Sequence, residues 1–393
     1  MKNKILIVVP SFENGGTIST LKSTLPYIDK EQCSIDVFPI TNAGANYDEI
    51  SKFARVIGQR IDNNADIGLS FKDRIHGAAF RGVKACKKML CRLGYDPSPI
   101  LFKRIVGKLQ KNHYDEVIAF QEGQATRFVK YFSNTRKIAW VHCDYSKISK
   151  NVQRIDKKEK VYDSFDYIIC VSEYTRSQFI KIVDNVDNKT VAIHNLISSE
   201  SIREKSVEII DDPSFLNFSG SRIVSVGRLA PVKRFSIIPQ IASNLKELGL
   251  SFHWYIIGGD DQDKKNIEDN IEHNKVSDVV SLLGNKNNPY PYIKTADILV
   301  CTSLSEACPN VINEAKILGT PILTTNFGSA SELMTNGVEG LITPVENLID
   351  SLYRLLYDEN LRRQIKSNIS IYEYDNRPIL EKLIQVTLLR FYM

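Results

Sequence analysis

"DILVCTSLSEACPNVINEAKILGTPILTT", residues 297–325, predicts a buried strand, a polar loop, a helix and a second buried strand. Pro309 suits the first helical position, because the N–H that proline lacks has no partner there in any helix. Gly319 suits the end of the helix, where a left-handed backbone conformation is common. A strand, a helix and a strand in this order form one crossover unit, and such units build parallel sheets. The stretch therefore predicts an α/β fold.

The same alternation extends along the whole chain. Short apolar runs predict buried strands at 4–9, 35–40, 115–120, 136–142, 166–172 and 190–195, and again at 222–227, 252–258, 279–284, 297–302, 321–325 and 339–343. Helical or polar stretches separate these runs, as in doubly wound sheets covered by helices on both faces. We therefore expect two doubly wound, Rossmann-like domains that face each other across a cleft.

The domain boundaries follow from the spacing of these runs. We expect a first domain at 1–196, a hinge in the polar, strandless span 197–220, a second domain at 221–375, and a C-terminal helix at 376–393 that packs back on the first domain. Domains of roughly 150–200 residues are the usual solution for a chain of this length. In such sheets ligands bind at the carboxyl ends of the strands, so functional motifs should directly follow strands.

The composition is that of an ordinary globular protein. The 393 residues are 43% apolar and 25% charged, and no run approaches the ~18 apolar residues that a membrane span needs. We interpret the start, "MKNKILIVVP", as a first buried strand and not as a signal peptide. The seven cysteines are scattered, without a Cys-x-x-Cys pair. This pattern favours reduced thiols in the cytoplasm and argues against a zinc site.

The net charge of +5 is unevenly distributed. Residues 72–111 carry eleven Lys and Arg against two Asp, a local charge of +9, whereas the remainder of the chain is −4. Such a segment attracts phosphate, and we expect it to attach the protein to an anionic membrane surface, on the inner face of the cell membrane. A solvated helix face is the alternative interpretation. No nucleic-acid partner is expected.

Two glutamates, Glu306 and Glu314, bracket the start of the predicted helix. Cys308, before Pro309, is a poor side-chain cap, so the first N–H groups of the helix are available to a phosphate. A carboxylate at Glu314 can accept two hydrogen bonds from vicinal hydroxyls, such as those of a ribose. The pair could therefore bracket a nucleotide-sugar. The alternative is a structural helix with one exposed and one capping glutamate.

A second motif, "VSVGRLAPVKRF" at 224–235, places Arg228 and Lys233 after a predicted strand. Two cations at the carboxyl end of a strand can neutralise a diphosphate as it leaves. Surface bases at a helix start are the alternative, although cations there oppose the helix dipole.

The first half offers weaker signals, each placed after a strand. Gly15 and Gly16 allow a ligand to approach the backbone, but no Gly-x-Gly-x-x-Gly fingerprint is present. His142, in "AWVHCDYS", could bond to a sugar hydroxyl or could be structural. The same two interpretations apply to Gln121 and Glu122. In the second half, the turn-rich loop 284–290 could seat a nucleobase or simply connect two elements.

Together and in this order, the motifs resemble those of the retaining glycosyltransferases of family 4, which have the GT-B fold. "SEACPNVINEAKILGTPILTTNFGSASELM" is similar to the family's Glu-x7-Glu signature and the segment that follows it, and "SVGRLAPVKR" to its diphosphate-binding segment. "NGG" and "VHCDY" resemble its glycine loop and its histidine. The resemblance spans almost the whole chain and is looser at 40–110.

The resemblance implies a role for each site residue. Glu314 would hold the ribose, whereas Glu306 and the backbone of Ala307, Cys308, Pro309, Asn310 and Val311 would hold the donor sugar and the diphosphate. Arg228 and Lys233 would neutralise the phosphates, and Gly15, Gly16 and His142 would complete the site from the first, acceptor-binding domain. Glu306, His142, Arg228 and Lys233 are the expected catalytic residues.

The resemblance also implies the reaction. A hexose or N-acetylhexosamine would pass from a nucleotide-sugar, expected to be a UDP-sugar, to a glycan or lipid-linked acceptor in bacterial surface-polysaccharide synthesis. The anomeric configuration would be retained, and neither a metal nor another cofactor is expected. The family usually has a glycine and an aromatic residue directly after the first glutamate, where this chain has Ala307 and Cys308, so the sugar is left open.

Two alternatives keep the fold and change the function. One is a GT-B phosphorylase or epimerase, although no context for a pyridoxal-phosphate lysine is found. The other is a nucleotide-sugar-binding partner without catalysis, against which the intact Glu306, Glu314, Arg228 and Lys233 argue.

Overall fold

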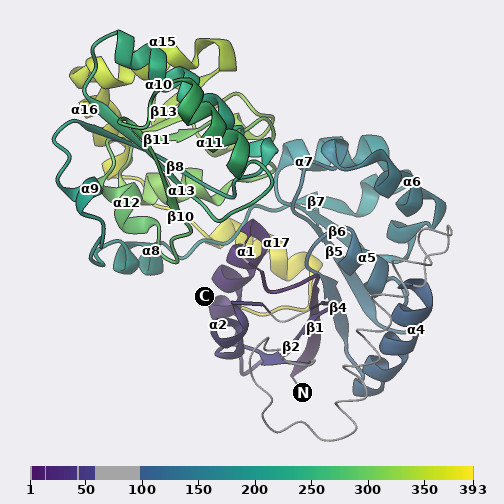
Figure 1. Cartoon of the computed structure of the whole chain (residues 1–393). Coiled ribbons are helices and arrows are strands. Elements are labelled where there is room, and N and C mark those ends of the chain that lie inside the picture. Colours follow the sequence, from purple (N-terminus) through teal and green to yellow (C-terminus); the bar gives the residue numbers. More distant parts are fainter. Residues whose placement is uncertain (1, 14, 42–43, 58–97, 393) are drawn as a thin grey trace, which may run out of the picture.

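The computed structural model describes residues 2–13, 15–41, 44–57 and 98–392, and it contains two parallel sheets (Figure 1). The first sheet has the order β3-β2-β1-β4-β5-β6-β7. Its strands are β1 (Asn3–Val9), β2 (Cys33–Pro39), β3 (Arg55–Val56), β4 (Glu116–Ala119), β5 (Arg136–Val141), β6 (Tyr167–Cys170) and β7 (Thr190–Ala192).

The second sheet has the order β10-β9-β8-β11-β12-β13. Its strands are β8 (Ser221–Val226), β9 (Phe252–Ile257), β10 (Val280–Gly284), β11 (Ile298–Cys301), β12 (Ile322–Thr325) and β13 (Gly340–Thr343). The strand order reverses beside β1 in the first sheet and beside β8 in the second, and such a reversal opens a ligand-binding crevice at the carboxyl ends of the strands.

The prediction of two doubly wound parallel sheets is confirmed, and each of the twelve predicted strands is present. The strand that the sequence did not predict is β3, which has two residues at a sheet edge, too short to show a pattern. Helices α8 (Ser199–Lys205) and α9 (Pro213–Leu216) occupy the predicted hinge 197–220. Where the hinge itself begins and ends stays a prediction.

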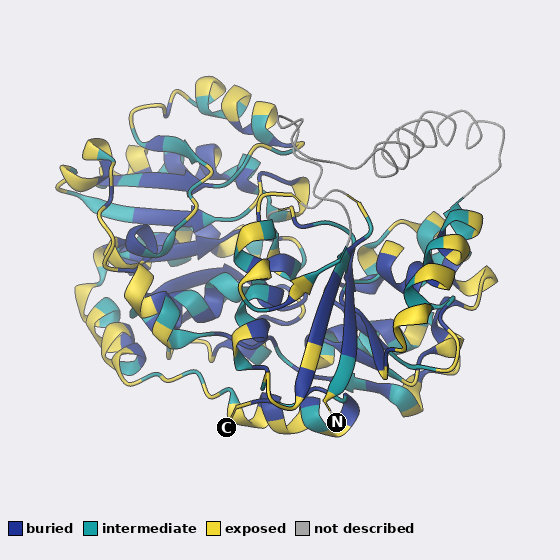
Figure 2. Cartoon of the chain, turned by 90° about the horizontal axis from the view of Figure 1, so that it is seen from below, coloured by how far each residue is buried: buried dark blue, intermediate teal, exposed yellow. Residues whose placement is uncertain are grey.

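Helices cover both sheets. In the first half these are α1 (Gly16–Thr24), α2 (Tyr47–Ser51), α4 (Ser98–Leu109), α5 (Gln124–Val129), α6 (Lys150–Lys158) and α7 (Glu173–Ile182). In the second half they are α10 (Ile238–Glu247), α11 (Lys264–His273), α12 (Tyr290–Thr295), α13 (Asn310–Leu318), α14 (Ala330–Leu333), α15 (Leu348–Tyr357) and α16 (Glu359–Ser370). The strands lie buried between helices whose outer faces are exposed (Figure 2).

One apolar cluster runs from the first half of the chain into the second. It contains Phe120 and Trp140 from the first half together with Cys308 and Ile312 from the second. Two further clusters fill the rest of each half. The two halves therefore share buried apolar surface, which stabilises their contact.

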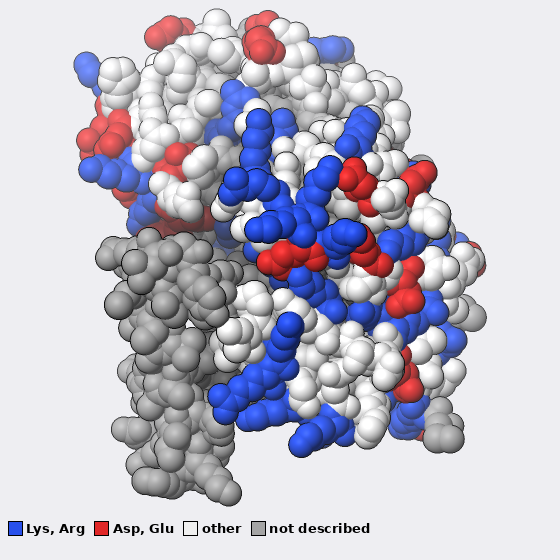
Figure 3. Space-filling view, turned by 90° about the vertical axis from the view of Figure 1, so that its right-hand side faces the viewer, with Lys and Arg blue, Asp and Glu red and all other residues white. Residues whose placement is uncertain are grey.

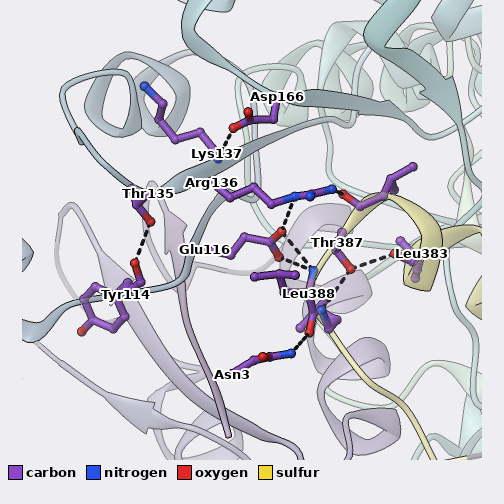
Figure 4. A network of polar contacts seen from close by, with 12 residues as sticks. Asn3, Tyr114, Glu116, Thr135, Arg136, Lys137, Asp166, Leu383, Thr387 and Leu388 are labelled. Carbon is purple, nitrogen blue, oxygen red and sulfur yellow. Dashed lines mark hydrogen bonds and ion pairs between the residues drawn. The ribbon is translucent and has the colours of Figure 1, made fainter. Parts of the chain in front are cut away.

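The C-terminal segment returns to the first sheet. Helix α17 (Arg377–Val386) ends earlier than the predicted 376–393, because Thr387 has an extended backbone. Figure 4 shows the next residue, Leu388, whose N–H donates to both carboxylate oxygens of Glu116 at 3.0 Å. Asn3 donates to the Leu388 carbonyl at 2.7 Å, and Arg136 forms an ion pair with Glu116 at 3.2 Å. The fully buried Glu116 thus fastens the C-terminal segment to β4.

This fastening should make stability depend on pH. Burial raises the pKa of Glu116 to about 7, against the opposing effects of the Leu388 N–H and Arg136. A carboxyl with a raised pKa binds more protons when folded than when unfolded, so its contribution to stability falls as pH rises from about 4.5 to 7. We expect Glu116→Gln to flatten the dependence of the unfolding free energy on pH across this window by ~1–3 kcal/mol.

Chemical denaturation of wild type and Glu116→Gln at pH 5, 6, 7 and 8 measures the difference. Glu381→Gln, an exposed change on α17, is the matched control and should keep the wild-type slope. Parallel curves for wild type and Glu116→Gln would show that the buried carboxyl does not titrate in this range.

Candidate active site

The structure brings Glu306 and Lys233 into direct contact. Lys233 Nζ donates to Glu306 Oε1 at 2.6 Å, and Ser303 Oγ donates to the same oxygen at 2.6 Å. Glu306 follows β11 and Lys233 follows β8, and these strands are neighbours at the order reversal of the second sheet. Burial lowers the pKa of Lys233, but the charge of Glu306, its hydrogen bond and the neighbouring Cys301 together outweigh burial, so the pKa is raised. Lys233 therefore stays a cation in this partly buried pair.

Backbone contacts hold this ion pair in place. Thr302 Oγ1 donates to the Lys233 carbonyl at 2.7 Å, and Leu304 N–H donates to the Val232 carbonyl at 2.8 Å. Ser329 Oγ donates to the Glu306 carbonyl at 3.1 Å. The loop after β11 is therefore fastened both to the turn that carries Lys233 and to the segment after β12.

Arg228 lies near Lys233 but is bound elsewhere. Its side chain is exposed, and its guanidinium donates to Asp261 Oδ2 at 3.0 Å. The positive charge of Arg228 lowers the pKa of Lys233, but this effect is smaller than the rise caused by Glu306. The two predicted cations therefore lie on one side of the site, and only Lys233 contacts Glu306.

Glu314 lies in the second turn of α13, and Tyr290 OH donates to its Oε1 at 3.5 Å. Burial raises the pKa of Glu314 to about 7, and the Tyr290 hydroxyl and the charge of Lys233 oppose this rise. Lys233 therefore contacts Glu306 directly, whereas its effect on Glu314 is that of a nearby charge. Tyr290 comes from the end of the predicted nucleobase loop 284–290, so this loop borders Glu314.

The start of α13 differs by one position from the prediction. Pro309 is the N-cap and Asn310 is the first helical residue, because the ψ angle of 114° at Pro309 is extended. As expected, no side chain among the described residues caps this helix. The Asn195 side chain donates to Asn310 Oδ1 at 2.9 Å, and Asn310 donates to Thr20 Oγ1 of α1 at 3.4 Å. The start of α13 therefore faces the first half of the chain.

Helix α1 begins at the second of the two glycines, Gly16. Gly15 is its N-cap, and no described side chain caps it. A Cβ atom added to Gly15 or Gly16 would meet nothing within 4 Å. Packing within the protein therefore does not require glycine here, and the prediction that these residues admit a ligand stays open.

The residues between Glu306 and α13 are covered. Ala307 is 5% and Cys308 9% exposed, both within the shared apolar cluster. Burial raises the pKa of the Cys308 thiol to about 12, so it is uncharged at neutral pH. The side chains of Ala307 and Cys308 are therefore covered, and a contact between a ligand and the backbone from Ala307 to Val311 stays a prediction.

His142 follows β5, and its ring stacks on Trp140 and lies near Phe120. Burial lowers the pKa of His142 to about 3, so the ring is neutral. Its Nε2 is buried and has no hydrogen-bond partner among the described residues. The backbone N–H of His142 donates to Glu122 Oε2 at 2.8 Å, so Glu122 supports the loop that carries His142. Gln121 lies beside it, half-buried.

Sequence reasoning missed four contributors to the site. Ser303 and Ser305 lie beside Glu306, and Tyr174 and Glu332 lie at the contact between the two halves. The serines fall inside the quoted motif but have no pattern of their own. Glu332 binds backbone N–H groups 158 and 159 positions away, a contact that leaves no signal in sequence.

Two further searches cover only the described part of the chain. Within it, no three His, Cys, Asp or Glu side chains are grouped so that they could hold a metal ion. No helix in the same residues is long and apolar enough to cross a membrane.

Residues 208–370 match the sequence profile of the family described as glycosyl transferases group 1. One relative is the N-acetylgalactosamine-N,N'-diacetylbacillosaminyl-diphospho-undecaprenol 4-alpha-N-acetylgalactosaminyltransferase of Campylobacter jejuni. The two proteins are 25% identical over 287 residues, and this alignment covers 71% of this chain and 72% of the relative. This chain is also 26% identical over 208 residues to an uncharacterised glycosyltransferase of Methanocaldococcus jannaschii. That alignment covers 52% of this chain and only about half, 53%, of the relative.

Among solved structures, Anabaena Alr3699/HepE in complex with UDP and glucose superimposes with a TM-score of 0.74 at 18% identity, over 98% of each chain. The superposition confirms the predicted GT-B fold. The profile match agrees with the predicted resemblance to glycosyltransferases over residues 208–370, which contain Lys233, Glu306 and Glu314.

Proposed function

We propose that this chain, whose residues 208–370 match the glycosyl transferases group 1 profile, transfers a hexose or N-acetylhexosamine from a UDP-sugar to a glycan or lipid-linked acceptor. The observation that carries the proposal is the partly buried ion pair between Lys233 and Glu306 at the order reversal of the second sheet, with Glu314 in the helix that follows Glu306. Such a group of charges after parallel strands suits an anionic nucleotide.

The leaving diphosphate is held at the start of α13. The free N–H groups of that helix and its positive dipole end attract phosphate oxygens. Lys233, and Arg228 after it turns from Asp261, add positive charge where negative charge develops in the transition state. Lys233 then lies between the diphosphate and Glu306, so the carboxylate keeps the ammonium in position.

The ribose and the sugar are bound on the two sides of this cation. Glu314 accepts hydrogen bonds from the ribose 2′- and 3′-hydroxyls, next to a uracil seated by loop 284–290. Glu306 contacts the donor sugar, and the neutral ring of His142 shares one hydrogen bond with a sugar hydroxyl through Nε2. A neutral ring suits this role because it adds no charge beside the sugar.

In the reaction, the bond between the anomeric carbon and the UDP oxygen breaks as the acceptor oxygen bonds to the same carbon. The proton of the acceptor hydroxyl passes to a donor phosphate oxygen, and the anomeric configuration is retained. The protein contributes orientation and charge stabilisation, which together account for most of the rate enhancement in such a mechanism. The proposal needs no metal ion, because cations of the chain balance the charge of UDP.

The names of the relatives support the acceptor class. The Campylobacter protein is named for transfer to a sugar carried on diphospho-undecaprenol, and another relative, from Staphylococcus aureus, is named for capsular polysaccharide biosynthesis. We therefore propose a lipid-linked acceptor in surface-polysaccharide synthesis for this chain as well, at the cytoplasmic face of the membrane.

A thermal-shift panel tests the donor. The panel contains UDP, several UDP-hexoses, several UDP-N-acetylhexosamines, GDP-mannose and ADP-glucose, all at equal concentration. A ligand present at a hundredfold its dissociation constant adds ~2.7 kcal/mol of stability. We expect UDP and at least one UDP-sugar to raise the melting temperature more than the other nucleotides do. A panel without any shift, or one led by ADP or GDP compounds, would contradict the proposed donor.

We also propose a surface for membrane attachment, part of which lies outside the predicted segment 72–111. Of that segment, residues 72–97 lie outside the described residues, and α4 carries the exposed Lys103, Arg104, Lys108 and, just beyond its end, Lys111. Residues 147–160, around α6, add six Lys and Arg against two acids, one of them the buried Asp156. Figure 3 shows Lys and Arg gathered on this face of the first half.

Replacing Lys150, Arg154, Lys157 and Lys158 with glutamine should reduce binding to vesicles that contain anionic lipid. Each base near such a surface contributes ~1 kcal/mol, screened by salt. Sedimentation with vesicles of 30% phosphatidylglycerol measures the loss. The matched control replaces four exposed lysines of the second half, Lys246, Lys265, Lys275 and Lys294, and should bind as wild type does. If the two quadruple variants sediment equally with the vesicles, the basic face around α6 does not bind the membrane.

A further inference from the structure

A carboxylate of the second half binds the start of a helix in the first half. Glu332, on α14, accepts from the Glu173 N–H through Oε2 at 2.8 Å and from the Tyr174 N–H through Oε1 at 2.7 Å. Glu173 and Tyr174 are the first two residues of α7. Their N–H groups have no partner within the helix, and the positive end of the helix dipole favours a negative charge there.

The remaining N–H groups of this first turn are satisfied locally. Ser172 Oγ accepts from Thr175 N–H at 3.1 Å, and the Ser172 carbonyl accepts from Arg176 N–H at 2.9 Å. Only the two groups bound by Glu332 therefore depend on the other half of the chain. His194, in the connection after β7, adds a contact from its Nε2 to Glu332 Oε2 at 3.4 Å.

Next to this contact the two halves approach too closely for any residue but glycine. A Cβ atom on Gly328 would come within 2.1 Å of the Tyr174 ring. The hydroxyl of the same ring donates to Asp144 Oδ2 at 3.0 Å. Ser305 of the second half donates to that oxygen as well, at 3.1 Å. Asp144 itself is buried, at 4% exposure, and its two partners are half-buried.

The same contacts reach Glu306 from two sides. Ser305 directly precedes Glu306 in the chain, and Ser329, which bonds to the Glu306 carbonyl, lies three residues before Glu332. We propose that Glu332 is a latch that holds the two halves closed, and that closure positions Glu306 for the transfer step. Glu332 touches no reacting atom in this proposal and is a positioning residue.

The latch deepens the proposed function and rests on it for its catalytic consequence. If the halves separate, Glu332 loses both N–H partners and Ser305 loses Asp144, so the loop of Glu306 is held from one side only. A carboxylate that binds only the closed arrangement shifts the population toward it. Weakening the latch should therefore raise the open population and lower the turnover number, and leave each half folded.

Three variants test the latch. Glu332→Gln removes the charge, Gly328→Ala forces the Tyr174 ring away, and Tyr174→Phe removes only the bond to Asp144. Glu346→Gln, an exposed change in the second half, is the matched control. Small-angle scattering is recorded with and without saturating UDP, and UDP release from the UDP-sugar gives kcat and KM.

We expect wild type and Glu346→Gln with UDP to give the scattering profile of the arrangement described above. Glu332→Gln and Gly328→Ala should have a larger radius of gyration, and their kcat should fall roughly tenfold, because a smaller fraction of the protein is closed. Tyr174→Phe should lie between them and wild type. If Glu332→Gln and Gly328→Ala both give the scattering profile and the kcat of wild type, the proposal is overturned.

Scattering separates this proposal from the proposed function. If the wild type releases no UDP from any UDP-sugar, the transferase proposal fails, while larger radii in Glu332→Gln and Gly328→Ala would still support the latch. If the wild type is active and the variants stay compact with full kcat, the latch fails and the transferase proposal stands.

Discussion

Glu314→Gln should bind both UDP and the UDP-sugar about 10–100-fold more weakly than wild type. A hydrogen bond to a charged group contributes ~1.5–3 kcal/mol, and the neutral amide of glutamine keeps only part of two such bonds to the ribose. Both ligands carry the ribose, so both should weaken equally. Isothermal titration of UDP and of the UDP-sugar into the two proteins measures this, with Glu346→Gln as control.

The pH dependence gives this prediction a second signature. The pKa of Glu314 is raised to about 7 by burial, so much of the free protein carries a protonated carboxyl below pH 7. Ribose hydroxyls donate to the charged form and favour it. Wild-type affinity for UDP should therefore increase from pH 6 to pH 8 more steeply than that of Glu314→Gln. In the variant the Glu314 carboxyl is absent, so only the titration of the UDP phosphate affects binding.

The alternative interpretation of Glu314 predicts a different result. If the residue only supports α13, Glu314→Gln lowers the melting temperature slightly and leaves both affinities as they are. Equal UDP affinity in wild type and variant at pH 7.5 would rule out the ribose contact.

Glu306→Gln should lower kcat by about 10²–10³-fold, the effect usual for removing one group that stabilises a developing charge. UDP affinity should stay at the wild-type value or rise, because Lys233 then loses its internal counter-charge and is available to the diphosphate. An effect on kcat without a loss of ground-state binding indicates a contact that matters in the transition state.

Ser303→Ala provides a graded control, because Ser303 donates to the same oxygen of Glu306. We expect a smaller fall in kcat than for Glu306→Gln and unchanged UDP affinity. Circular dichroism and melting curves establish that both variants fold. A variant Glu306→Gln that loses UDP affinity and keeps kcat would reverse the roles assigned to the two glutamates.

The parts of the site that follow strands were predictable. Lys233 and Glu306 are 73 positions apart, yet each follows a parallel strand, and carboxyl ends of parallel strands meet at one edge of the sheet. The spacing from Glu306 to Glu314 placed the second glutamate inside α13. Among the described residues, the apolar runs similarly located every strand except the two-residue β3.

The parts that depend on contact between the two halves were not predictable. Glu332 binds backbone N–H groups, which every residue but proline possesses, so no residue type marks its partner. Arg228 shows the same limit, because its salt bridge to Asp261 depends on the path of an exposed loop. Glu116 did leave a signal, since a charged residue in an apolar strand needs a buried partner, but nothing indicated that the partner is Leu388.

The central claim is that this chain transfers a sugar from a UDP-sugar. It is tested most directly by incubating the purified wild-type protein with each UDP-hexose and UDP-N-acetylhexosamine and measuring released UDP, without acceptor and with a membrane extract that supplies lipid-linked glycans. The account predicts slow release from at least one UDP-sugar alone, and faster release from the same sugar with the extract. No release from any UDP-sugar under either condition would contradict it.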